Sequence, residues 1–146
     1  MPEHIRLWSM SDRFHEAAKD LSKDGRQGWG FPVPHYLAGH AIELALKAHL
    51  VHRGADERSL KSLGHDLEAA MRASNANLIA ILTPEEEAAI RWINPYYEGK
   101  ELEYTAFGAA GRMISVPDVS LLNSATEKLL RHLRATFPAS TSPPDP

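Results

Sequence analysis

One long helical segment limits the possible folds of this chain more than any other feature. It begins at Pro34, a residue type that suits the first position of a helix, and runs to a break at Gly54. Its apolar residues form two stripes on roughly opposite sides of the helix. One stripe is Leu37, Ala41, Leu44, Ala48 and Val51, and the other is Ile42, Leu46 and Leu50. Such a helix needs neighbours on both sides, in the middle of a bundle or against a second subunit, so we predict a homodimer.

Four further helices are predicted from apolar spacings of three and four residues. They run from Ser11 to about Lys23, from His65 to about Ser74, from Thr83 to about Asn94 and from Pro117 to Thr136. Ser11 is the expected N-cap of the first, whose apolar positions are Phe14, Ala17, Ala18 and Leu21. Thr83, Pro84 and Glu86 form a strong helix-start signal. We therefore predict an all-α fold, an antiparallel up-and-down bundle of four to five helices in one domain, residues 1–138.

Three stretches lack helical periodicity. Residues 25–34 are rich in Gly and Pro and predict a packed loop. Residues 95–116, between the last two long helices, predict an irregular excursion that could hold short extended pieces, and a loop of that length favours a functional role. The tail at residues 139–146 is rich in Pro and Ser and is predicted to be disordered.

Composition restricts the function classes. The 146 residues are 43% hydrophobic and 24% charged, as in ordinary globular domains. The formal charge of -3 provides no overall attraction to nucleic acid or to a membrane, so a nucleic-acid site would be a local patch. The absence of cysteine excludes a thiolate nucleophile and a sulfur-based zinc site. No leader or membrane-spanning run is evident, and we expect a cytoplasmic location.

A polar stripe on the long helix is the first candidate site. Tyr36, His40, Glu43 and Lys47 share one edge, between the two apolar stripes. Glu43 and Lys47 could simply be an i,i+4 surface pair. Alternatively, the neighbouring apolar faces desolvate them and make them part of a binding pocket.

His65 and Asp66 form the second candidate site, at the start of a predicted helix whose free N–H groups attract anions. They could serve only as a cap and an interhelical hydrogen bond. In a functional site, His65 would be a general acid or base or a phosphate contact. The histidine spacings do not favour a shared metal ion, and no glycine-rich phosphate loop is present, so we predict no cofactor.

The segment NPYYEGKELEY is the third candidate, because Tyr97 and Lys100 combine an aromatic ring with a cation, as in proteins that bind single-stranded nucleic acid. The glutamates of the same segment cancel its positive charge. Packing or dimer contacts are therefore favoured over nucleic acid.

The order of YLAGHAIELALKAHL, LGHDLEAAM and NPYYEGKELEY resembles the HEPN domain family, the higher eukaryote and prokaryote nucleotide-binding group. The resemblance implies a dimeric helical bundle from a group associated with RNA cleavage, toxin-antitoxin and defence systems, and nucleotidyltransferase partner proteins. Ribonuclease members carry an Arg, four to six residues and a His near the start of a late helix. Arg58 and His65 match that spacing but lie before and at the start of the third predicted helix, away from the expected late helix.

Three functions are therefore expected. The leading one is a HEPN-like module that binds a nucleotide, RNA or a partner protein in a pocket lined by Glu43, Lys47, His65 and Asp66. The first alternative is a metal-independent endoribonuclease that uses His65 and Arg58. The second is a purely structural, dimeric accessory protein.

Overall fold

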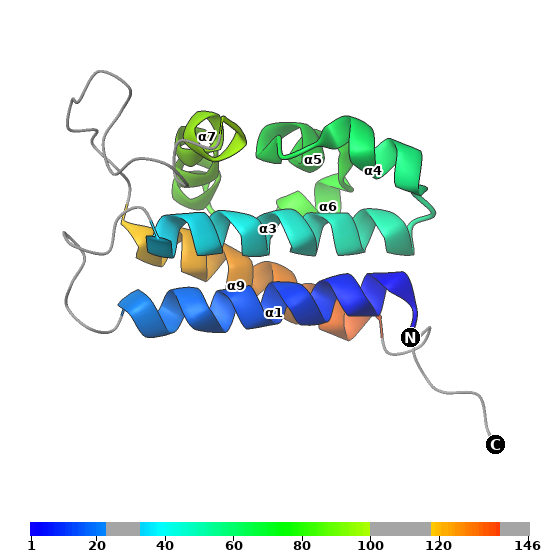
Figure 1. Ribbon diagram of the computed structural model, residues 1–146, viewed down its shortest axis with the longest axis horizontal. Coiled ribbons are helices and arrows are strands. Elements are labelled where there is room, and N and C mark those ends of the chain that lie inside the picture. Colours follow the sequence, from blue (N-terminus) through cyan, green and yellow to red (C-terminus); the bar gives the residue numbers. More distant parts are fainter. Residues whose placement is uncertain (23–32, 100–117, 138–146) are drawn as a thin grey trace.

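The structure is a computed structural model that describes residues 1–22, 33–99 and 118–137. Every regular element in these ranges is an α-helix, as predicted, and the helices pack as a bundle (Figure 1). α3 lies between α1 and the group formed by α4, α5 and α7, and α9 packs against α1, α3 and α7. The helices are α1 (Glu3–Ser22), α3 (Val33–His52), α4 (Glu57–Leu63), α5 (Leu67–Ala73), α6 (Ala76–Ile79), α7 (Pro84–Glu98) and α9 (Val119–Thr136).

α3 is the central helix, and it ends before Gly54, whose φ of 102° fits the predicted break. Both of its apolar stripes are covered within one chain, since α3 contacts α1 and α9 as well as α5 and α7. Among the described residues, the exposed large hydrophobic side chains are Met1, Leu21 and Val33. The two-sided pattern of α3 is therefore explained without a second subunit, and the homodimer stays a prediction.

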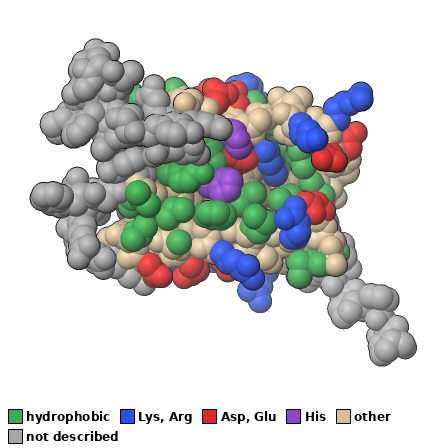
Figure 2. Space-filling view, viewed as in Figure 1, with side chains coloured by type: hydrophobic (Ala, Val, Ile, Leu, Met, Phe, Trp, Pro, Cys, Tyr) green, Lys and Arg blue, Asp and Glu red, His purple; other side chains and the backbone are tan. Residues whose placement is uncertain are grey.

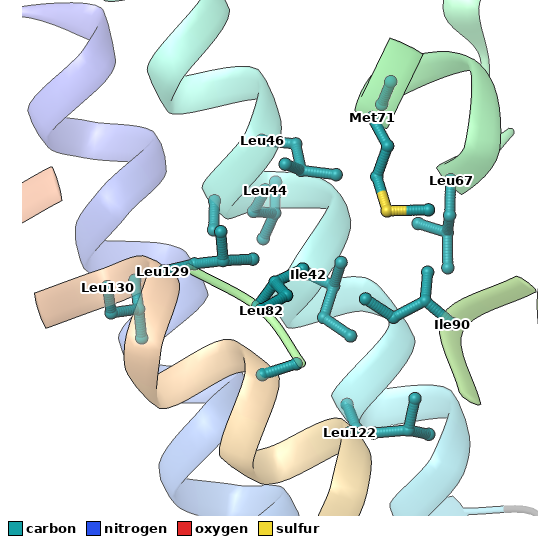
Figure 3. Packing of buried hydrophobic residues seen from close by; sticks show 14 of the residues in the cluster. Ile42, Leu44, Leu46, Leu67, Met71, Leu82, Ile90, Leu122, Leu129 and Leu130 are labelled. Carbon is teal, nitrogen blue, oxygen red and sulfur yellow. The ribbon is translucent and has the colours of Figure 1, made fainter. Parts of the chain in front are cut away.

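The core gathers branched aliphatic side chains from α3, α5, α7 and α9 (Figure 3). Ile42 and Leu46 of α3, Ile90 of α7 and Leu129 of α9 are fully buried. Truncating any one of them to Ala is expected to cost about 2–5 kcal/mol of folding free energy. Because α3 and α7 share this core, their packing also sets where the polar edge of α3 lies relative to α7.

α1 begins eight residues earlier than the sequence predicts. Ser11 is not an N-cap: it lies in the middle of the helix, fully buried, and its hydroxyl donates a hydrogen bond of 2.6 Å to the carbonyl oxygen of Ala41. Leu21, predicted on the apolar face, is 42% exposed. The buried residues of α1 are Leu7, Ser11, His15 and Ala18, and apolar spacing alone does not reveal this set because two of its members are polar.

The region after α3 holds three short helices rather than one. α4 occupies a stretch in which no helix was predicted, and the Asp56 side chain caps it by accepting from the backbone N–H of Ser59. The helix predicted from His65 starts at Leu67, because Asp66 is its cap. Gly64, with a φ of 58°, forms the corner between α4 and α5.

α7 starts as predicted and ends later. The capping box is present, with the N–H of Thr83 donating to Glu86 Oε1 and the N–H of Glu86 donating to Thr83 Oγ1. The predicted end at Asn94 and the irregular excursion predicted from residue 95 are wrong at this point, since the helix continues through Pro95 to Glu98. Pro95 removes one backbone hydrogen bond from the helix, and the turn that contains it carries the buried Tyr97.

α9 begins at Val119, with Asp118 as its cap, slightly later than predicted. The rest of the predicted excursion, most of the predicted loop at residues 25–34 and the tail lie outside the described residues.

Candidate functional site

The polar edge of α3 meets the corner between α4 and α5 and the last turn of α7. Five side chains gather there, and we call them the Glu43 cluster: His40, Glu43, Lys47, His65 and Tyr97. All five were candidates from the sequence, on three separate segments. Figure 2 shows histidine, acidic and basic side chains close together near the middle of this face.

Glu43 is the centre of the cluster and is only 4% exposed. Its Oε1 accepts hydrogen bonds from the Tyr97 hydroxyl at 2.6 Å and from His65 Nδ1 at 2.9 Å. Its Oε2 accepts one from Lys47 Nζ at 2.8 Å. The desolvation expected for Glu43 and Lys47 is confirmed, with side chains 5% and 14% exposed. A carboxylate with three charged or polar donors is well compensated for its burial.

The Glu43 carboxyl stays ionised in this environment. Burial alone would raise its pKa, but the hydrogen bonds from Lys47, Tyr97 and His65 together lower the pKa below the ordinary value of a glutamate. Because an ionised carboxylate only accepts hydrogen bonds, each of its three partners must supply the proton.

These requirements fix the protons of the cluster. Tyr97 gives its one hydroxyl proton to Glu43, so its oxygen must accept from His40 Nδ1, which lies 2.8 Å away. His65 must carry its proton on Nδ1 to donate to Glu43. The Nε2 of a neutral His65 is then an unprotonated acceptor, on a side chain that is 48% exposed.

Backbone geometry brings the three segments together. Lys47 Nζ also donates to the carbonyl oxygen of Gly64 at 2.8 Å, which ties the corner that carries His65 to α3. Gly39 lets α7 approach, because a Cβ at this position would lie 2.9 Å from Cδ1 of the Tyr97 ring. Gly39 was not predicted as a site residue, and the signal available for it was a glycine in the interior of a strong helix.

An aromatic rim lies beside the cluster. The rings of Tyr36 and His40 are nearly parallel, 6.1 Å apart with 14° between their planes. Tyr36 also lies 5.9 Å from the Tyr97 ring, and Phe14 of α1 meets His40 edge-on at 4.5 Å. Tyr36 is thus next to the hydrogen-bonded residues, as its place on the polar stripe of α3 predicted.

Asp66 caps a helix, whereas the adjacent His65 belongs to the Glu43 cluster. Its carboxylate accepts from the backbone N–H of Ala69 and from Asn94 Nδ2, both at 3.0 Å, and the first of these contacts is the main cause of its lowered pKa. Asn94 in turn accepts from the N–H of Leu67 at 2.7 Å. Asp66 therefore caps α5 and joins it to α7.

The remaining candidate residues are Arg58 and Lys100. Arg58 is exposed in the first turn of α4, and no hydrogen bond joins it to His65 in the part of the chain that the structure describes. Lys100 lies outside the described residues. Within those residues, no group of three or more His, Asp and Glu side chains has an arrangement that could hold a metal ion.

Comparisons with family models, curated proteins and solved structures give no match for this chain. No described helix is long and apolar enough to cross a membrane. The case for a function therefore depends on the chemistry of the Glu43 cluster: an imidazole oriented by a buried carboxylate, a lysine beside it and tyrosine rings at its edge.

Proposed function

We propose that this chain is a HEPN-like module, an up-and-down bundle of four to five helices, that binds a nucleotide or single-stranded RNA at the Glu43 cluster. The observation that carries the proposal is the hydrogen bond from His65 Nδ1 to the buried Glu43, which orients a half-exposed imidazole at the surface. A histidine used only for packing would not need a buried carboxylate to fix its tautomer.

The ligand chemistry follows from charge and ring placement. Lys47 neutralises Glu43, so the cluster carries no net negative charge that would repel a phosphate. The rings of Tyr36 and His40 lie at the edge of the cluster, where a base could stack on them. A phosphate beside an aromatic rim is the recognition pattern of single-stranded nucleic acid.

The proposal is tested by fluorescence anisotropy with a labelled single-stranded RNA at low salt. We expect His65→Ala and Lys47→Met to weaken binding at least tenfold, which corresponds to about 1.4 kcal/mol. His132→Ala is the matched control, because His132 is exposed on α9 and makes no contact with the cluster. Circular dichroism confirms that each variant is folded. Equal RNA affinity of the unchanged chain and of the three variants would exclude the Glu43 cluster as the binding site.

A second function, metal-independent RNA cleavage, is favoured by the same hydrogen bond. A carboxylate that holds Nδ1–H leaves Nε2 as the basic nitrogen, the arrangement that general-base histidines use. We expect cleavage in EDTA that is lost in His65→Ala, kept in His132→Ala and absent with a substrate lacking 2′-hydroxyls. An Arg58→Ala variant shows whether Arg58, from the same chain or across a dimer, takes part.

The resemblance also supports a homodimer with a nucleotidyltransferase-type partner protein, and we further propose the cytoplasmic location expected from the sequence. Sedimentation of the purified chain tests the first part of this proposal. A sedimentation coefficient that matches a monomer at every protein concentration would contradict the proposed homodimer.

A further inference from the structure

A cavity lies between α5, α6 and α7, away from the Glu43 cluster. Its volume is about 410 Å³, and none of its lining residues belongs to the Glu43 cluster. This volume is in the range of small-molecule sites in proteins. The cavity is therefore large enough to hold a ligand of its own.

The cavity has an apolar floor. Met71, which is 7% exposed, and the half-buried Ile79 belong to the side chains that line it. A thioether and a branched aliphatic chain favour contact with an aliphatic group rather than with water. The floor thus predicts a ligand with an aliphatic part.

Four charged side chains surround this floor without forming hydrogen bonds to one another. Arg91 Nε lies 4.0 Å from Glu68 Oε1, and an Arg91 Nη lies 3.9 Å from Glu87 Oε1. Both distances exceed hydrogen-bond range. Arg72 makes no hydrogen bond in the described part of the chain. The guanidinium donors and carboxylate acceptors therefore keep their capacity to bind a ligand.

We propose that this cavity binds a free α-amino acid with an aliphatic side chain. The carboxylate of the amino acid would bind the guanidinium groups of Arg91 and Arg72, and its ammonium group would bind Glu68 and Glu87. A simple anion would be repelled by the two glutamates and a simple cation by the two arginines. A ligand with both charges next to each other and an aliphatic group satisfies every part of the lining.

The test is an NMR titration of the full chain, labelled at its methionine methyl groups, with L-leucine. The Met71 signal is assigned with a Met71→Leu variant. We expect a saturable shift of this signal with L-leucine. Isocaproate lacks the ammonium group and isopentylamine lacks the carboxylate, so each should bind at least tenfold more weakly. Glycine, which lacks the aliphatic group, should also bind at least tenfold more weakly.

Variants locate the site. Arg91→Met should weaken leucine binding at least tenfold. Arg131→Met is the matched control, because Arg131 is also an exposed arginine paired with a glutamate one turn away, but on α9, and its variant should bind as the original chain does. The absence of a saturable shift at about 10 mM leucine would overturn the proposal. Equal binding of either singly charged analogue, or of glycine, would overturn the assignment to an aliphatic amino acid.

Discussion

Replacing Tyr97 with Phe tests the cluster with the smallest change that the structure offers. The variant removes one hydroxyl and leaves the ring against Gly39. That hydroxyl donates to Glu43 Oε1 at 2.6 Å and accepts from His40 Nδ1 at 2.8 Å. Glu43 would keep its bonds from Lys47 and His65, so the charge stays partly compensated.

The expected cost is about 2 kcal/mol of unfolding free energy at neutral pH, because hydrogen bonds to charged groups contribute about 1.5–3 kcal/mol. The cost should depend on pH. The hydrogen bond from Tyr97 lowers the pKa of Glu43, so the stability that it adds is present above the ordinary glutamate pKa of 4.5 and is lost as pH falls through the lower pKa of the folded state.

The assay is urea denaturation followed by circular dichroism, at neutral pH and below pH 4.5. Tyr96→Phe is the matched control, because Tyr96 is the adjacent residue of α7 and its hydroxyl makes no hydrogen bond within the described residues. We expect the control to change stability by less than about 0.5 kcal/mol. An equally small effect of Tyr97→Phe, or a cost that persists unchanged in acid, would refute the proposed role of Glu43.

Three further changes are predicted. Burial, with nearby cations, lowers the pKa of His49 to about 4, so the chain should lose stability as pH falls from 6.5 to about 4, by at most about 3 kcal/mol from this residue. His49→Gln should flatten that part of the pH profile measured by urea denaturation, and an unchanged slope would contradict the assignment. Glu86→Gln should cost about 2 kcal/mol at neutral pH, because hydrogen bonds from α9 and from its own cap hold the Glu86 pKa at about 2 despite burial. The exposed Glu57→Gln is its control and should change stability by less than about 0.5 kcal/mol in the same assay. Gly39→Ala should lower the thermal midpoint and cost about 1–3 kcal/mol, since the added methyl group would clash with the Tyr97 ring; a gain in stability would show that the two helices can move apart.

Helical periodicity predicted the helices whose apolar side chains recur along a face of the helix. The bounds of α3, the capping box of α7 and the shared edge of His40, Glu43 and Lys47 all follow from spacing along a single helix. These features depend on neighbours in sequence, and a single chain is enough to reveal them.

Contacts between distant segments were harder to predict. Buried Ser11 donates its proton to a carbonyl of α3, and α7 continues through Pro95 to Tyr97, whose hydroxyl donates to Glu43. Tyr97 was predicted as a candidate residue, but its partner 54 residues away was not predicted. Such pairings depend on how helices pack, which apolar spacing along one helix does not specify.

The most direct test of the proposed site is the imidazole nitrogen spectrum of His65 during titration with single-stranded RNA. We expect the neutral ring to carry its proton on Nδ1, held by Glu43, and we expect the Nε2 signal to shift saturably as RNA binds. A neutral ring with its proton on Nε2 in the free protein would contradict the hydrogen bond, and an Nε2 signal unchanged at saturating RNA would contradict the site.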